Sequence, residues 1–220
     1  MVPPLVVGLM LSLLSLVLLL PPPAVAATMT GRVVGADGQG IAGAVVFIQA
    51  LPAGVQYPPQ TQPAVMDQVH KTFVPEVLPV VVGSAVRFPN HDQIHHHVYS
   101  FSRTKSFELP LYKGEEAPPV LFDKVGVVKI GCNIHDWMAA VLLVVPTPFY
   151  AVTNDGGEVT LSGLPEGTLP VAAWHELSQT KVEETVQQLR VEQDLAGVTF
   201  ALALAPARPR LPVQGVRGSR

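Results

Sequence analysis

Short runs of apolar and β-branched residues, separated by turn residues, make up most of this chain. No long segment repeats its apolar residues with the 3.6-residue period of a helix, so the pattern predicts an all-β fold. Closely spaced short runs in the centre of the chain are typical of a Greek-key sandwich. The central runs are residues 78–82, 85–88, 96–101, 117–122, 125–130 and 140–145, and the flanking runs are residues 30–34, 44–49, 158–161, 169–174 and 198–204.

Two segments do not fit this pattern. Residues 51–63 are rich in Pro and Gln and have no period, which is typical of a linker or surface loop. Residues 181–192 are densely charged, and their pattern is compatible with either a pair of polar strands or a short helix.

The two ends of the chain are predicted to lie outside the fold. Residues 1–26 have no charged side chain, a short apolar run and a small-x-small ending at Ala26, as in a signal peptide. The run is shorter than the roughly 20 residues of a membrane span. We therefore expect the signal peptide to be cleaved and the mature chain to have no membrane span. The mature protein would then be periplasmic or secreted. Because no Lys or Arg precedes the run, an uncleaved N-terminal anchor stays open. The Pro- and Gly-rich tail, residues 205–220, is predicted to be disordered.

The charge distribution excludes some function classes. The formal net charge is −3, and the tail carries four arginines and no acid, so the rest of the chain is mildly acidic. Such a body does not suggest a nucleic-acid partner. No nucleophile elbow or phosphate-binding loop is present, and we expect no enzymatic activity.

The single cysteine, Cys132, is the most informative residue. A chain exported to an oxidising compartment usually has no cysteine or has cysteines in pairs. A lone cysteine there is most simply a buried free thiol. However, the sequence around Cys132 is Gly131-Cys-Asn-Ile-His135-Asp-Trp-Met138, between two apolar strand-like runs. We therefore expect the three sulfur and imidazole side chains to share one tight loop between two strands.

These side chains form an unusual set of metal ligands. A thioether is a weak donor that zinc sites rarely use, whereas copper sites combine two His, one Cys and a long axial Met. A second imidazole must then come from elsewhere, and His95, His96 and His97 lie at the start of a predicted strand. Since neighbours on a strand point to opposite faces, only one of His96 and His97 should face a metal in regular geometry.

The residues of this block resemble the cupredoxins, the blue-copper family. The Cys-x2-His-x2-Met spacing is similar to that of amicyanin, and residues 80–90 resemble the strand, glycine turn and strand before the first ligand. The resemblance implies one copper ion per chain, held by His96, Cys132, His135 and Met138. The neighbouring His97, His95 and His91 are weaker candidates, for direct metal contact or for support of a ligand. Gly131, Ala140 and His97 depart from the family pattern. The block is also similar to bacterial methylamine utilization proteins.

The flanking segments carry a second resemblance. Their Gly-, Val- and turn-rich stretches, around residues 31–46 and 153–167, resemble a carboxypeptidase regulatory-like β-sandwich. We therefore expect a cupredoxin domain at residues 64–146, inserted in or packed against a split sandwich of residues 27–51 and 147–204.

The first resemblance implies a function and its alternatives. It implies an electron carrier in which His135 is the exposed edge, and a transient redox partner such as a c-type cytochrome or a periplasmic dehydrogenase. The departures keep open a red or green copper protein whose open site binds a small ligand. The histidine-rich stretch keeps open a copper-trafficking module, and a purely structural sandwich with a buried thiol is the remaining alternative.

Overall fold

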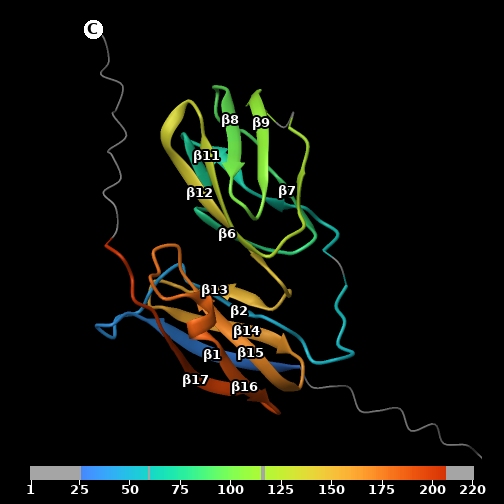
Figure 1. The fold of residues 1–220 in the computed structure, drawn as a ribbon, viewed down its shortest axis with the longest axis vertical. Helices are drawn as coiled ribbons and strands as arrows, with labels where there is room; N and C mark the ends of the chain where they lie inside the picture. Colours follow the sequence, from blue (N-terminus) through green and yellow to red (C-terminus); the bar gives the residue numbers. More distant parts are fainter. Residues whose placement is uncertain (1–25, 59, 115–116, 207–220) are drawn as a thin grey trace, which may run out of the picture.

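A computed structural model describes residues 26–58, 60–114 and 117–206. The prediction of an all-β fold is confirmed, since strands and turns form the body and one short 3-10 helix, η1 (Val182–Thr185), interrupts them (Figure 1). Residues 1–25 of the predicted signal peptide and 207–220 of the predicted tail lie outside the described residues. Within the described ranges, none of the helical segments has the length and hydrophobicity needed to span a membrane.

Two sheets and one hairpin make up the middle of the chain. A five-stranded sheet faces a three-stranded sheet, and the core between them includes the fully buried Phe73, Phe122 and Leu142. The larger sheet has the order β6 (Val77–Val81), β12 (His135–Val145), β11 (Gly126–Cys132), β8 (His96–Phe101), β9 (Ser106–Tyr112). The smaller has the order β10 (Val120–Phe122), β7 (Ser84–Arg87), β3 (Ala64–Val65), and the hairpin pairs β4 (Asp67–Val69) with β5 (Thr72–Val74).

The flanking segments, which precede and follow this block, fold together into two further sheets. Strands from both flanks pair side by side, as where Gly31 of the first flank pairs with Val159 of the second. A separate apolar core fills the space between the two sheets. One sheet has the order β14 (Glu158–Leu164), β1 (Ala27–Val34), β17 (Leu195–Ala201), and the other β13 (Tyr150–Val152), β2 (Val45–Ile48), β15 (Gly167–Trp174), β16 (Gln187–Val191).

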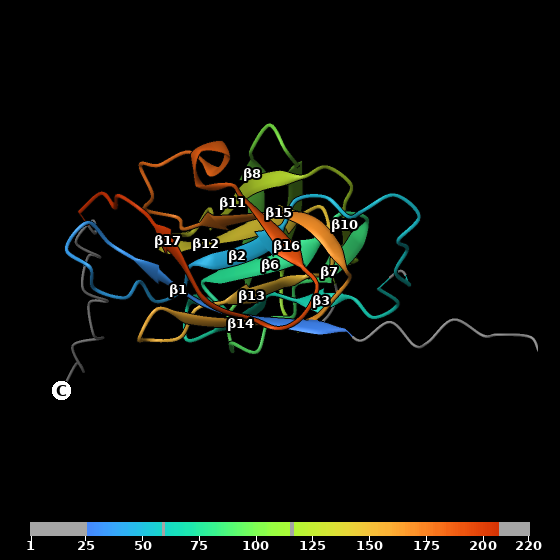
Figure 2. The ribbon, with the colours of Figure 1, turned by 90° about the horizontal axis from the view of Figure 1, so that it is seen from below.

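A third apolar core joins the middle block to the flanks. Val81, Leu143 and Val145 from the five-stranded sheet pack against Phe47 and Trp174 from the four-stranded sheet. Seen from below, β2 and β15 lie over β6 and β12 (Figure 2). The second half of strand β12, residues 140–145, therefore buries both of its faces. This explains why its second half is continuously apolar instead of alternating.

The observed strands differ from the sequence prediction most clearly at β9, and the structure also assigns the two segments that did not fit the strand pattern. Strand β9 was missed, because Pro110 and the polar residues around it hide the strand pattern. The ambiguous segment 181–192 contains both the short helix η1 and the strand β16. The described residues of 51–63 form no strand, which agrees with the predicted loop.

Acidification is expected to weaken this fold through His175. Burial lowers the pKa of His175 below its usual 6.5, and its Nδ1 accepts a hydrogen bond from the amide of Leu177 that a protonated ring could not accept. Since the unfolded chain takes up this proton more readily, stability contributed by neutral His175 is present above about pH 6.5 and is lost as the pH falls below it. Urea unfolding at a series of pH values between about 7.5 and 5 should show a shallower loss in His175→Gln than in the wild type. Equal slopes would contradict this assignment.

Candidate metal centre

Three side chains of the middle block meet at one end of the five-stranded sheet. Cys132 ends β11, His135 begins β12 after a two-residue turn, and His96 begins the neighbouring strand β8. The Sγ of Cys132 lies 3.6 Å from Nδ1 of His135 and 3.8 Å from Nδ1 of His96. The sulfur and one nitrogen of each imidazole all lie within 4.8 Å of one another, so they can serve as donors to a single ion.

The spacing of these atoms fits a bound metal ion. Bonds of about 2.3 Å to sulfur and about 2.0 Å to nitrogen, meeting at about 110–120°, separate the two donor atoms by about 3.5–3.7 Å. The observed separations of 3.6 and 3.8 Å agree with this within about 0.1–0.3 Å. The donor set is therefore already arranged for a trigonal or tetrahedral ion, with both Nδ1 atoms turned to the thiol.

Met138 belongs to the same core as Cys132. Its side chain is almost fully buried, and both residues line one groove on the surface of the sheet. A methionine in this place adds a soft thioether beside a His-Cys-His set.

The loop prediction was wrong in its extent. Only Asn133 and Ile134 form the turn, whereas His135 and Met138 are part of strand β12. The register shifts between Gly131 and Cys132, so that Cys132 pairs with His135 across the turn. The ladder of β11 and β12 thus extends up to the donor atoms and holds them on paired backbone rather than on a free loop.

The structure separates the remaining histidines from this cluster. His96 is fully buried, whereas the adjacent His97 points to the opposite side of β8 and its Nε2 contacts Oε1 of Glu108 at 2.8 Å. His95 is exposed, and Nδ1 of His91 contacts the Asp67 carboxylate at 2.8 Å. The expectation that one of the pair His96 and His97 faces the other donors agrees with this arrangement, and His96 is the one that does.

Asp92 was missed in the sequence, where it belongs to a polar turn. Its Oδ2 lies 2.8 Å from Nε2 of His96, the ring nitrogen that faces away from Cys132. Burial opposes ionisation of this carboxyl group, but hydrogen bonds from the amide of Lys71, from His96 and from the amide of His70 hold the pKa of Asp92 below its usual value. The only sequence signal was an acidic residue four positions before the histidine, which by itself is common in loops.

His135 is the more exposed of the two histidines. Burial lowers the pKa of His135, and the nearby His96 and Lys71 lower it further. The neutral imidazole that results is the form that can bind a metal. Its ring lies 5.4 Å from that of Trp137, between centroids, and Trp137 and Ile134 are both exposed beside it.

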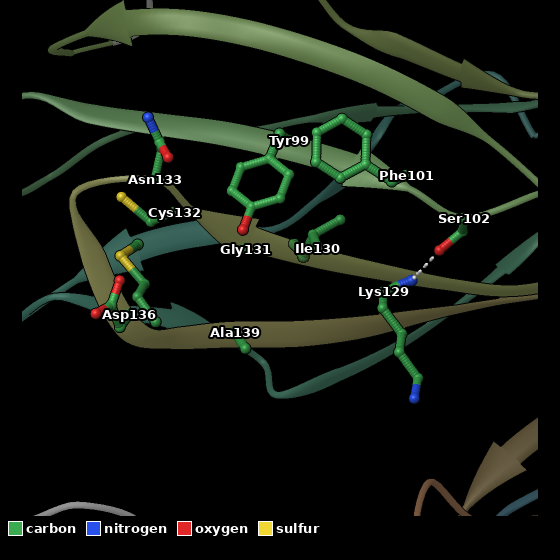
Figure 3. A pocket seen from close by; sticks show the side chains of 11 residues that line it. Tyr99, Phe101, Ser102, Lys129, Ile130, Gly131, Cys132, Asn133, Asp136 and Ala139 are labelled. Carbon is green, nitrogen blue, oxygen red and sulfur yellow. Dashed lines mark hydrogen bonds between the residues drawn. The ribbon is translucent and has the colours of Figure 1, made fainter.

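A shallow groove of about 410 Å³ leads along the sheet to Cys132. It runs from Asn133 and Cys132 past the ring of Tyr99 to Lys129 (Figure 3). A Cβ atom at Gly131 would lie 3.2 Å from Cζ and from the hydroxyl oxygen of Tyr99, so the side chain of Tyr99 borders the space that a larger residue at Gly131 would need. A larger residue before Cys132 would therefore require Tyr99 of the neighbouring strand to shift by a few tenths of an ångström.

Comparison with known proteins finds structural similarity only. No protein-family model and no curated protein matches this sequence. Among solved structures, the chain is similar to a Cu(I) form of an amicyanin mutant, with 22% identity, a TM-score of 0.35, and coverage of 37% of this chain and 81% of the other. It is also similar to a purple cupredoxin from Nitrosopumilus maritimus, with 22% identity, a TM-score of 0.33, and coverage of 37% and 98%. For a copper-containing nitrite reductase from Thermus scotoductus, the identity is 24%, the TM-score 0.37, and the coverage 46% of this chain and 25% of the other.

Proposed function

We propose that this chain is an exported electron carrier that holds one copper ion at a type-1-like site. The proposed ligands are Nδ1 of His96, Sγ of Cys132 and Nδ1 of His135, with the sulfur of Met138 as a weak fourth ligand. The observation that carries this proposal is the approach of both Nδ1 atoms to the single thiol, at 3.6 and 3.8 Å. Copper bound there supplies one-electron chemistry by alternating between Cu(I) and Cu(II).

The choice of copper over zinc rests on the donors. Structural zinc sites use Cys, His or carboxylate ligands and rarely a thioether, whereas copper accepts a long bond to Met beside two His and one Cys. The surrounding ladder supports electron transfer, because donors fixed on paired strands and a packed core move little between oxidation states. The chain thus contributes positioned donor atoms and a largely apolar surrounding in which Cys132 is 3% exposed.

We further propose that electrons pass through the edge of His135. What supports this is its position beside the exposed Trp137 and Ile134, whereas His96 is fully buried. A small apolar face around an exposed ligand suits a brief encounter with a redox protein, such as a c-type cytochrome or a periplasmic dehydrogenase.

The middle block is proposed to be a cupredoxin domain of the type found in methylamine utilization proteins, and the flanks a carboxypeptidase regulatory-like sandwich. Support comes from the Cys-x2-His-x2-Met spacing and from the way the two flanks pair into common sheets. Export to the periplasm or outside the cell is proposed from the sequence of residues 1–26.

One observation favours a second candidate, an open copper site that binds a small ligand. The groove beside Tyr99 reaches Cys132 and Met138, and Gly131 leaves this side of the sulfur without a side chain of its own. A small molecule that entered there would approach the ion from the side of the thiolate. Such a site would give a red or green protein rather than a blue one.

Copper loading and spectroscopy test both candidates. We expect the wild type to bind one copper ion per chain, with an intense absorption band in the orange-red region and narrow copper hyperfine splitting in its EPR spectrum. A variant with His91, His95 and His97 all replaced by Ala should keep this stoichiometry and spectrum, because none of the three faces Cys132. Loss of binding in that variant would instead support copper trafficking by the histidine-rich stretch. An intense band at shorter wavelength with wider splitting would favour the open site.

A further inference from the structure

We propose that Asp92 is a positioning residue that fixes the ligating nitrogen of His96 and lowers the reduction potential of the copper centre. The inference rests on the proposed function, since it concerns the same site. It adds a residue, Asp92, to which the Cys-x2-His-x2-Met pattern does not point.

The contact with Asp92 determines the tautomer of His96. Oδ2 of Asp92 lies 2.8 Å from Nε2 of His96, and an ionised carboxylate can only accept hydrogen bonds. Nε2 must therefore carry the hydrogen and donate it. The lone pair of the neutral ring is then on Nδ1, the atom that faces Cys132. The carboxylate thus presents the correct nitrogen to the metal.

The carboxylate is itself held in place by backbone groups. The amide of His70 donates to Oδ1 of Asp92 at 2.6 Å, and the amide of Lys71 donates to Oδ2 at 2.7 Å. His70 and Lys71 form the turn between β4 and β5, with φ angles of 53° and 58°. Consecutive residues in this conformation direct their N–H groups to one side and form a small anion-binding nest.

The loop that carries Asp92 is fixed from the other side by Asn90. The buried amide group of Asn90 donates to the carbonyls of Ile94 and Tyr112 and accepts a hydrogen bond from the amide of Asp92. Hydrogen bonds therefore fix the backbone amide of Asp92, both of its carboxylate oxygens and the imidazole that it contacts. Little freedom is left for the carboxylate to turn away from His96.

Burial makes this carboxylate important for the metal. The side chain of His96 is 0% exposed and that of Asp92 only 12% exposed, so water screens their interaction poorly. A carboxylate that accepts a hydrogen bond from the second nitrogen of a ligating imidazole makes that imidazole a stronger electron donor to the metal. Stronger donation and the negative charge both stabilise Cu(II) more than Cu(I), and a lower reduction potential follows.

The chain contains a second Asp–His pair that has no contact with the proposed metal ligands, and this pair provides a control. Asp67 contacts Nδ1 of His91 at the same 2.8 Å, but the His91 side chain is 61% exposed and is not among the grouped donors. Replacing Asp67 by Asn removes the same charge from the same kind of pair. It therefore controls for the general effect of one negative charge on this part of the surface.

The reduction potential and EPR spectrum of copper-loaded Asp92→Asn, beside Asp67→Asn and the wild type, test the proposal. Loss of a partner that supports a metal ligand typically weakens metal affinity about 10–100-fold. We expect the Cu(II)-to-Cu(I) affinity ratio to fall at least about tenfold in Asp92→Asn, an upward shift of about 59 mV for each factor of ten. The EPR spectrum should change with it, and both properties should stay at wild-type values in Asp67→Asn. An unchanged potential in Asp92→Asn, or an equal shift in both variants, would overturn the inference.

A measurement on the wild type tests the proposal even if the Asp92 variant does not fold. In the diamagnetic Cu(I) protein, long-range proton–nitrogen NMR spectra should show a protonated Nε2 on His96 and a metal-bound Nδ1. A metal-bound Nε2 would refute the role of Asp92 even if the variant could not be purified. If the wild type shows no thiolate-to-copper band, the proposed function itself fails. An unchanged reduction potential in Asp92→Asn overturns only the role of Asp92.

Discussion

Replacement of Cys132 by Ser is expected to abolish the intense visible band of the copper-loaded protein. That band arises from charge transfer between a thiolate and Cu(II), and Cys132 is the only cysteine in the chain. Serine keeps the shape of the side chain but offers a neutral hydroxyl at the position where both Nδ1 atoms converge. Loss of a residue that only supports a ligand costs about 10–100-fold in metal affinity, so loss of the thiolate itself should cost more than about 100-fold.

Stoichiometry by metal analysis and a competition titration against a copper chelator measure this effect. Far-ultraviolet circular dichroism serves as the folding control, since the Cys132 side chain is buried and its replacement must not disturb the sheet. Retention of the wild-type colour and affinity would refute the ligand assignment. Absence of copper binding in both proteins would instead indicate a structural sandwich with a buried thiol.

The sequence was sufficient to predict the two strands on either side of the donor loop, because residues 125–130 and 140–145 are apolar runs bounded by turn residues. It placed Cys132, His135 and Met138 on the loop between these runs, whereas the structure includes them in β11 and β12. Alternation along a strand indicated that only one of His96 and His97 turns inward, and the choice of His96 came from the resemblance to the cupredoxins. The prediction failed for β9, where Pro110 and polar residues replace the apolar pattern at an edge of the sheet. A strand at an edge is specified more by its neighbour than by its own composition.

Asp92 shows the limit of sequence reasoning at the site. Its role depends on a hairpin turn that begins 22 residues earlier, at His70, and on the inward direction of His96. Neither relation leaves a local pattern, because hydrogen bonds between a loop and a distant turn depend on tertiary packing. The same holds for Gly131, where a Cβ atom would crowd the side chain of Tyr99 on the neighbouring strand.

The contact between the middle block and the flanks is expected to be essential for stability, and Leu143→Asp tests it. Leu143 is 3% exposed and lies in the core shared by the five-stranded and four-stranded sheets. Loss of a buried leucine costs about 2–5 kcal/mol, and the new carboxylate would lack a cationic partner among the apolar residues of that core. The free energy of unfolding should fall by more than about 4 kcal/mol, which is a large part of the about 5–15 kcal/mol of a typical domain.

Leu111→Asp is the matched control, because Leu111 is 57% exposed on strand β9 and its replacement should change stability by no more than about 0.5 kcal/mol. Urea unfolding, followed by circular dichroism and by tryptophan fluorescence, measures both variants. Because Trp174 lies in the shared core and Trp137 beside the candidate metal centre, coincident transitions would show that the two parts unfold together. A Leu143→Asp protein with wild-type stability, or one in which the flanks keep full stability while the middle block unfolds, would show that the shared core does not couple them. In that case the flanks would be an independent module, and the position of the donor atoms would depend on the middle block alone.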